Sequence, residues 1–490
     1  MADREEQSLG KKAARAAKWS IVTQIVSKLI SPVTTMVLAR LLSPEAFGIV
    51  ATATMVTSLA EMMSDAGFQK YLIQRDFSNR EEMSLSACVA FWTNLAIAIG
   101  MVVLITVFNN QLAAAVGNPG LGIVLVVASA SLPLTSLVSV QTALYQREFD
   151  FKTLFASGAG SSLLILVVSV ALALIGFDYW SMIAGTIASK TLLAVWLTAK
   201  SRWKPQFNYS FAELKQMFSF GGWVLVESFA TWVNTWAGTF ILGALMTSYY
   251  VGMYKTSTNI CASVTGVFTA AILPIAFAAL SRVQEDETRF EAILLKMQRY
   301  LAICVIPVSV LSLAYSKVLT FILLGDQWGE TQLFVGLWMF TGCVNIVFGY
   351  MCSEAYRAKG KPHLCVLVQV LYLLPFLPAL YISASFGYGC VSVIMPALRI
   401  VLVMINLTVA KLALGLSPLK MLANVGPSFI QSLIAATPGI AALTFTDSLH
   451  IEIVAAFLSL ALYLLMLFSW KSTRETSLDL LKRLGLSKAH

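Results

Sequence analysis

Long apolar stretches alternate with short polar turns along almost the whole chain. Each stretch is close to the roughly 20 residues that a helix needs to cross the hydrocarbon core of a bilayer. Between Trp19 and Trp470, fourteen such stretches follow one another. The pattern therefore predicts an all-α integral membrane protein with about 14 transmembrane helices, at residues 18–42, 46–66, 83–108, 119–142, 153–176, 179–199, 218–243, 249–280, 300–324, 331–355, 363–385, 388–412, 424–446 and 450–470.

The first stretch has a copy in the second half of the chain. The segment Trp19–Gly48 aligns without a gap with Trp223–Gly252, 204 positions later, and Tyr145 aligns with Tyr356 at an offset of 211. Six spans return the chain to its starting side, so the halves are parallel repeats about an axis along the membrane normal. We predict two six-helix lobes around a central cavity, plus two C-terminal helices. The parts are an N-terminal cytoplasmic segment 1–17, an N-lobe 18–200, a cytoplasmic linker 201–217, a C-lobe 218–414, two helices within 424–470 and an amphipathic cytoplasmic tail 471–490.

Three Ser/Thr-x-x-Glu patterns at the ends of spans predict helix starts of the capping-box type. They are Ser78 with Glu81, Ser210 with Glu213, and Thr288 with Glu291. The middle one predicts a short surface helix that leads into the span at 218–243.

Lysine and arginine fall in alternate loops, and this indicates the orientation of the chain. The loops NNQLAAAVGNPG, GFDYW, GDQWGE and TDSLHIE contain neither residue, whereas the intervening loops and both ends of the chain carry them. By the positive-inside rule, the basic loops and both termini are predicted to be cytoplasmic. The net charge of +9 is therefore interpreted as a mark of topology, not of nucleic-acid binding.

The composition and the motifs exclude several classes of protein. Hydrophobic residues make up 58% of the chain and charged ones 12%, which excludes a water-soluble globular domain. The loops leave no room for a catalytic domain, and the sequence contains no Walker A, dinucleotide-binding or HExxH motif. Seven cysteines form no CxxC pair and the three histidines lack ligand spacing. We expect no enzyme, no metal and no cofactor.

A few cations lie too deep in the predicted spans to face lipid. An ionised side chain at the bilayer centre costs roughly 2.5–3.5 kcal/mol, so these residues are expected to face an interior cavity. Lys28, Lys190 and Arg399 fall near mid-membrane, and Lys255 lies nearer the outer face. Lys190 and Arg399 occupy corresponding spans at an offset of 209. Such cations would suit an anionic headgroup such as a pyrophosphate, which arginine can bind in a fork.

Three acidic residues are candidates for ion coupling. Glu61 and Glu227 lie in the inner third of the two halves, and Asp65 lies near the cytoplasmic edge. A carboxylate at such a place can exchange a proton or coordinate Na⁺. Glu61 reaches a depth similar to that of Lys28 on the adjacent helix, so a structural ion pair between these two is the alternative.

Two segments carry a resemblance to a known family. The segment Leu38–Arg75, LARLLSPEAFGIVATATMVTSLAEMMSDAGFQKYLIQR, and ALYQREFDFKTL after the fourth span resemble the polysaccharide transporter branch of the multidrug/oligosaccharidyl-lipid/polysaccharide (MOP) flippase superfamily, and in particular Wzx-type oligosaccharide flippases. The resemblance implies that the chain moves undecaprenyl-diphosphate-linked oligosaccharide repeat units from the inner to the outer leaflet of the bacterial inner membrane by alternating access, for exopolysaccharide, O-antigen or capsule assembly.

The same resemblance implies roles for particular residues and partners. The cationic residues that would engage the anionic substrate are Lys28, Lys190, Lys255 and Arg399, and the last two helices would contribute a groove for the lipid tail. A polymerase and the export machinery of the pathway are the expected protein partners, with coupling to H⁺ or Na⁺. No nucleic acid is expected to bind.

Two other functions stay open at this point. One is an H⁺- or Na⁺-coupled small-molecule antiporter of the multidrug type, although the absence of an obviously acidic cavity argues against cationic drugs. The other is a membrane polymerase or ligase of the same glycan pathway. Such enzymes usually carry a large outer loop with charged reaction groups, whereas the outer loops here are short and lack lysine and arginine.

Overall fold

The computed structural model describes residues 30–439, 448–470, 473–476 and 478–479. In this part of the chain all regular elements are helices, and ten are long and apolar enough to cross a membrane, or up to eleven if a bent pair in α11 is one span. The predicted all-α membrane architecture is confirmed, while the count of 14 stays a prediction. Contacts divide the chain into two compact units, Met1–Lys255 and Thr256–His490.

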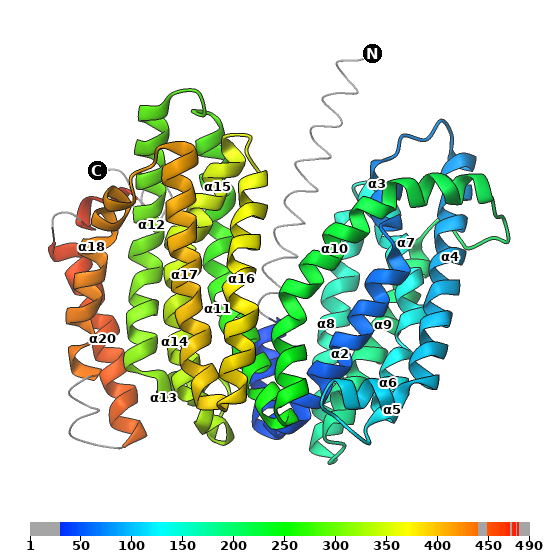
Figure 1. Cartoon of the computed structure of the whole chain (residues 1–490), viewed down its shortest axis with the longest axis horizontal. Coiled ribbons are helices and arrows are strands. Elements are labelled where there is room, and N and C mark those ends of the chain that lie inside the picture. The colour runs from blue at the N-terminus through cyan, green and yellow to red at the C-terminus, as the bar shows by residue number, and fades with distance from the viewer. Residues whose placement is uncertain (1–29, 440–447, 471–472, 477, 480–490) are drawn as a thin grey trace. The chain divides into compact units, whose positions relative to one another are not determined.

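The first unit is built from helices that follow the predicted spans closely. The predicted third span is helix α4, and the fourth is interrupted near Ala130, just before Pro133, and so forms α6 and α7. In chain order the described elements are a helix at Ile30–Leu41, α2 (Pro44–Asp65), α3 (Phe68–Gln74), α4 (Arg80–Val107), α5 (Asn109–Ala115), α6 (Gly122–Ser129), α7 (Leu132–Arg147), α8 (Phe151–Leu174), α9 (Tyr179–Lys200), α10 (Phe211–Leu245) and the first turns of α11 (Ser248–Ser281) (Figure 1).

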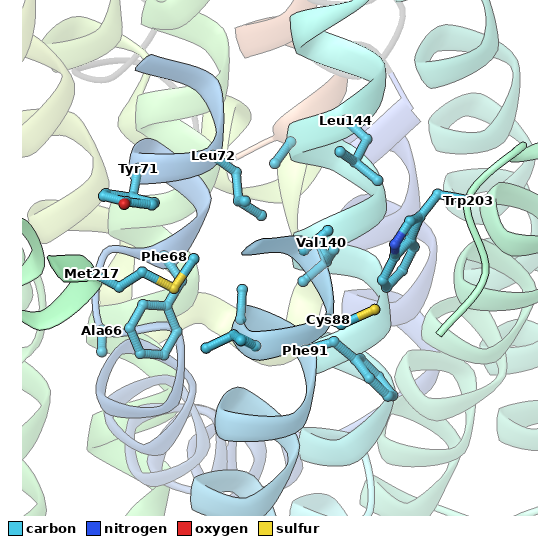
Figure 2. Packing of buried hydrophobic residues seen from close by; sticks show 14 residues of the cluster. Ala66, Phe68, Tyr71, Leu72, Cys88, Phe91, Val140, Leu144, Trp203 and Met217 are labelled. Carbon is cyan, nitrogen blue, oxygen red and sulfur yellow. The ribbon is translucent and has the colours of Figure 1, made fainter. Parts of the chain in front are cut away.

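One core of the first unit joins the short helix α3 to its neighbours. Figure 2 shows Phe68 and Leu72 of α3 among buried side chains that include Cys88 of α4, Val140 of α7 and Met217 of α10. These side chains are almost fully removed from solvent. Because α3 is too short to be stable alone, its position depends on this packing.

The second unit contains the remaining helices. The predicted span at 331–355 is one continuous helical segment in which α14, the π-helical turn η2 and α15 follow without a loop. The described elements after α11 are α12 (Glu287–Ala314), α13 (Ser316–Leu323), η1 (Asp326–Thr331), α14 (Gln332–Asn345), η2 (Ile346–Tyr350), α15 (Met351–Ala358), α16 (His363–Ser385), α17 (Tyr388–Leu414), α18 (Pro418–Ala435) and α20 (Leu449–Ser469).

Several predicted parts of the chain fall wholly or partly outside the described residues. These are the N-terminal segment 1–17, the first half of the span at 18–42, the end of the span at 424–446 and most of the tail 471–490. The contacts group α10 with the first unit, whereas the repeat assigned its membrane span to the C-lobe at 218–414. The lobe boundaries stay a prediction.

Two of the three predicted helix caps are wrong in register. Helix α4 is capped by Asn79, whose side chain accepts a hydrogen bond from the backbone N–H of Glu82 at 2.8 Å, and not by Ser78. Helix α12 begins at Glu287, with Asp286 as its cap, and so starts before Thr288. Short polar residues lie side by side at both places, and the one whose backbone is extended becomes the cap.

The third cap, at Ser210, is confirmed, but the element that it starts differs from the prediction. The Ser210 hydroxyl accepts from the N–H of Glu213 at 3.4 Å. The helix then runs unbroken from Phe211 to Leu245, so the predicted surface helix and the following span are one element.

The Glu213 carboxylate joins α10 to α3 and α4. It accepts hydrogen bonds from Arg75 at 2.5 Å, from Ser86 at 2.7 Å and from Tyr71 at 3.1 Å, and its side chain is 8% exposed. Burial, together with the negative charge of Glu213, raises the pKa of the Tyr71 phenol. The guanidinium of Arg147, which donates to the Arg75 carbonyl at 2.5 Å, closes the end of α3.

The two halves of the repeat contain equivalent hydrogen bonds from a tyrosine hydroxyl to a backbone carbonyl. In the first unit the Tyr145 hydroxyl donates to the carbonyl of Leu197 at 3.1 Å. In the second unit the Tyr356 hydroxyl donates to the carbonyl of Asn406 at 2.7 Å. The tyrosines are 211 positions apart and their acceptors 209. Residues of α9 and α17 therefore correspond to each other at an offset of 209, which also relates Lys190 to Arg399.

Candidate functional site

A cavity of about 120 Å³ lies inside the first unit, between α2, the α6–α7 junction and α9. Its wall is apolar near Val50 and Ile183 and becomes polar towards Glu61 and Lys190. The sequence places these two side chains deep in predicted spans. The cavity that they line lies within one unit, and the predicted central cavity between two lobes stays a prediction.

Lys190 and Glu61 form an ion pair at the wall of this cavity. The Lys190 ammonium also donates to the Thr135 hydroxyl at 3.1 Å. The single proton of that hydroxyl has two acceptors within reach, the Ser131 carbonyl at 3.1 Å and the Glu61 carboxylate at 3.3 Å. The two charged side chains are 26% and 27% exposed. The positive charge of Lys190 is therefore matched by a carboxylate of the same unit.

A second cavity, of about 260 Å³, adjoins the first one. Both are lined by Val50 and Thr186. Its hydroxyl groups come from the Ile30–Leu41 helix, α8 and α9, and the buried Ser169 hydroxyl has no partner among the described residues. Hydroxyl groups therefore contribute to the walls of both cavities.

A cavity of about 100 Å³ lies inside the second unit, between α11, α14 with η2, and α17. Its cation is Arg399, whose guanidinium carbon lies 3.6 Å from the centroid of the Trp338 ring. Arg399 also donates to the Trp338 backbone carbonyl at 3.2 Å. Stacking and hydrogen bonding together fix the plane of the guanidinium, which suits it to bind a planar or tetrahedral anion.

The two cation cavities are copies of each other. Residues that line the first cavity align with residues that line the second at the offsets of the repeat. The aligned pairs are Thr57 with Cys261, Ser58 with Ala262 and Glu61 with Thr265 at 204, Lys190 with Arg399 at 209, and Ser131 with Gly342 at 211. The repeat therefore duplicates a site as well as a scaffold.

The copies differ in charge. Glu61 corresponds to the uncharged Thr265, and Trp338 corresponds to Val127. The first cavity thus holds a cation with a carboxylate, and the second holds a cation on an aromatic ring. An incoming anion would compete with the Glu61 carboxylate for Lys190. At Arg399 it would find the uncharged Thr265 at the position of that carboxylate.

Lys255, Glu227 and Asp65, the other predicted site residues that the structure describes, line none of these three cavities. Lys255 donates to the Thr235 carbonyl at 3.3 Å and lies 3.9 Å from the centroid of the Trp236 ring. Glu227 forms an ion pair with Lys70 at 3.1 Å, and both side chains are mostly exposed.

Asp65 accepts a hydrogen bond from Ser139 at 2.5 Å at the end of α2. Lys28 lies outside the described residues, so the predicted Lys28–Glu61 pair is untested, but Lys190 is a partner of Glu61.

Trp338, Asn345, Thr135 and Thr265 were missed by the reading of the sequence. Thr265 could have been found by applying the offset of 204 to Glu61. The sequence pattern does not distinguish Trp338 from the other aromatic residues of its span. What distinguishes it is its contact with Arg399 on another helix.

The chain is similar to several polysaccharide transport proteins. Residues 37–333 match the model of a family described as "Polysaccharide biosynthesis protein". The succinoglycan biosynthesis transport protein ExoT of Rhizobium meliloti (strain 1021) is 27% identical over 327 residues, 67% of this chain and 65% of that protein. The lipopolysaccharide biosynthesis protein WzxC of Escherichia coli (strain K12) is 22% identical over 385 residues, 77% of this chain and 76% of that protein. The match spans just under two thirds of the first relative and about three quarters of the second.

Two solved structures share the fold. The lipid II flippase MurJ in an inward closed conformation has a TM-score of 0.70 at 14% identity, over 96% of this chain and 99% of that chain. An inward-facing multidrug resistance MATE family transporter of the MOP superfamily has a TM-score of 0.55 at 14% identity, over 87% and 96%. At this identity the likeness shows the fold alone.

Proposed function

Because the chain belongs to the polysaccharide biosynthesis protein family and is a Wzx-type flippase of the MOP superfamily, we propose that it carries an undecaprenyl-diphosphate-linked oligosaccharide from the inner to the outer leaflet by alternating access. The protein is a multi-pass membrane transporter of polysaccharide or lipid-linked oligosaccharide, and not an enzyme.

The observation that carries this proposal is the Arg399 cavity. Arg399 is oriented by Trp338, and the carboxylate that accompanies the cation in the first copy is replaced by Thr265. A diphosphate would bring negative charge to a cavity whose described lining residues include no acidic side chain. Charge-assisted hydrogen bonds to a guanidinium are about twice as strong as neutral ones. Arg399 is therefore the leading residue for the headgroup among the predicted cations.

The first cavity supports a different role in the transport cycle, namely ion coupling. Protonation of Glu61 would remove the charge that holds Lys190, and would release the ammonium to turn towards a diphosphate. The hydroxyl-lined cavity beside it would bring water to this carboxylate. We therefore assign ion coupling to Glu61, with H⁺ as the coupling ion, while Na⁺ is the alternative that the same carboxylate and hydroxyl oxygens would bind.

The expected membrane, topology and partners of the protein follow from the positive-inside pattern and from the family. The protein would lie in a bacterial inner membrane with both termini cytoplasmic, and would hand its substrate to the polymerase and export machinery of the pathway. Lys255 and Lys28 stay secondary candidates for headgroup contacts, and Glu227 and Asp65 for ion coupling.

A test in cells uses a strain that lacks this gene and any other flippase for the same glycan. We expect wild-type protein to restore surface glycan, and Arg399→Gln to lower it by at least about tenfold while lipid-linked repeat units accumulate inside. Arg282→Gln removes the same charge from an exposed residue and should restore glycan fully. Full restoration by Arg399→Gln would remove the Arg399 cavity from the mechanism, and altered drug accumulation with normal glycan would favour the antiporter instead.

A further inference from the structure

The second-unit cavity has an aromatic residue at its opening to which the proposed function gives no role. Tyr350 lines this cavity together with Arg399 and Trp338, and it is nevertheless 43% exposed. In the described part of the chain, the Tyr350 hydroxyl makes no hydrogen bond and its ring contacts no other aromatic or cationic group. The side chain is therefore accessible to a ligand that enters the cavity.

The π-helical turn η2 keeps Tyr350 on the cavity side of its helix. Four lining residues of this helical segment are spaced four apart: Trp338, Gly342, Ile346 and Tyr350. In a regular α-helix each step of four residues turns about 40° further around the axis, so the last of the four would point about 120° away from the first. The turn η2 covers Ile346–Tyr350, and its larger number of residues per turn reduces this rotation. Single π-turns are rare and recur at functional sites.

The distance between Tyr350 and Arg399 suits a diphosphate with a sugar attached. A β-carbon added at Gly342 would fall 2.8 Å from Nη1 of Arg399, so the guanidinium lies against this turn of α14. Tyr350 follows eight residues later, which is a rise of about 12 Å along a helix. Helical side chains point towards the N-terminus, so the ring leans back towards the guanidinium. A phosphate at Arg399 therefore leaves the attached sugar within reach of the ring.

The direction from Arg399 to Tyr350 also agrees with the expected substrate. The segment that contains Tyr350 continues to Ala358, and the basic loop that follows is predicted to be cytoplasmic. Tyr350 thus lies on the predicted cytoplasmic side of Arg399. A lipid of the inner leaflet carries its sugars on the cytoplasmic side of its diphosphate, which is the same order.

The first copy of the site lacks these aromatic residues. At the offset of 211, Tyr350 corresponds to Ser139, whose hydroxyl donates to Asp65, and Trp338 corresponds to Val127. The second copy therefore combines a cation with aromatic rings at two positions where the first copy has none. The face of an aromatic ring is negative and attracts the C–H groups of a sugar, whereas the cation attracts a phosphate.

We propose that a sugar of the lipid-linked substrate stacks on the ring of Tyr350 while Arg399 binds the diphosphate to which that sugar is attached. This inference rests on the proposed function and makes Tyr350 a specificity residue, which distinguishes a lipid diphosphate that carries a sugar from one that does not.

The test measures binding to purified full-length protein in lipid nanodiscs with matched probes. These are farnesyl diphosphate and the same molecule with glucose or N-acetylglucosamine attached to its diphosphate, so the probes differ only in the sugar. We expect at least one sugar-bearing probe to bind more tightly than farnesyl diphosphate. Tyr350→Leu should reduce this preference by about two- to tenfold and leave the affinity for farnesyl diphosphate unchanged, because only the stacking is lost. Tyr350→Phe keeps an aromatic face and should retain most of the preference.

Two further variants serve as controls. Arg399→Gln should weaken the binding of all three probes. Tyr381 of α16 is also an exposed tyrosine, at 57%, but it does not line the Arg399 cavity. Tyr381→Leu should therefore keep both the affinities and the preference of the wild type.

Four results would overturn the inference: no tighter binding of a sugar-bearing probe to the wild type, an unchanged preference in Tyr350→Leu, equal losses for probes with and without a sugar, or the same loss of preference in Tyr350→Phe as in Tyr350→Leu. If Tyr350→Leu does not fold, Tyr350→Ser repeats the measurement with the residue of the first copy. A loss of surface glycan in Arg399→Gln, combined with an unchanged preference in the Tyr350 variants, would leave the proposed function standing and remove only the role of Tyr350.

Discussion

Gly48 and Gly252 occupy the same position in the two copies of the repeat, and each faces the helix of the other. A β-carbon at Gly48 would fall closer than 3.0 Å to the carbonyl oxygen of Ser248, and one at Gly252 equally close to that of Pro44. Ser248 and Pro44 are themselves repeat partners. The crossing of α2 with the start of α11 is therefore symmetric, and glycine at both positions permits the approach of the two backbones.

We predict that Gly48→Ala and Gly252→Ala each lower the free energy of unfolding by about 1–3 kcal/mol, because a methyl group would force the two backbones apart. The control is Gly100→Ala in α4, where an added β-carbon meets nothing within 4 Å. It should be neutral or slightly stabilising, since alanine is the better helix former. Thermal unfolding of the purified variants measures all three, and equal midpoints would contradict the close crossing.

The Lys190–Glu61 pair predicts coupling between two substitutions. Lys190→Met leaves a carboxylate without its cation, and Glu61→Gln leaves the reverse, so each should destabilise the protein. The double variant should be more stable than the sum of the single effects implies, by about 1–2 kcal/mol. A double-mutant cycle of unfolding free energies measures this term, and simple additivity would mean that the pair does not form.

Comparison of the two cavities suggests a substitution that adds a carboxylate to the second one. Thr265→Glu would place a carboxylate where Glu61 lies in the other copy, next to Arg399. We expect it to lower surface glycan by about tenfold or more, because the new carboxylate would compete with the diphosphate for the guanidinium. Thr265→Gln, of the same size without the charge, should have a much smaller effect. Similar losses in both variants would show that space, and not charge, matters at this position.

Trp338 is predicted to act through Arg399. Trp338→Leu removes the stacking, whose strength is about 0.5–2 kcal/mol, and should weaken phosphate binding by about two- to thirtyfold. Trp338→Phe keeps an aromatic face and should lose less. Binding of inorganic phosphate to the purified variants measures the effect, and a Trp338→Leu affinity equal to that of the wild type would show that the guanidinium is held by other contacts.

Most of the fold could be predicted from the sequence because burial in lipid makes spans long and uniformly apolar. Helices α4, α8 and α16 begin and end close to the predicted spans. The errors lie at helix starts. At α4 and α12 several capping residues are adjacent, and sequence alone does not say which one has the extended backbone.

The site was less predictable because depth along a helix says nothing of direction around it. Lys28 and Lys190 both fall near mid-membrane, so counting residues could not decide which one faces Glu61. The rotation of α9 against α2 brings Lys190 to Glu61, and that rotation depends on packing. The repeat links Lys190 to Arg399 without reference to that rotation, because it compares positions along the chain.

The hydrogen bonds of Tyr145 and Tyr356 constrain the rotation of α9 against α7 and of α17 against α15. In each unit the phenol holds the carbonyl of the seventh residue after the cation, Leu197 after Lys190 and Asn406 after Arg399. Seven residues make nearly two turns, so the phenol and the cation share one side of the helix. Deleting one residue between them would keep the tyrosine bond and turn the cation by about 100° away from its cavity. Each phenol thus fixes the rotation of its partner helix, and the cation two turns away depends on that rotation to face its cavity.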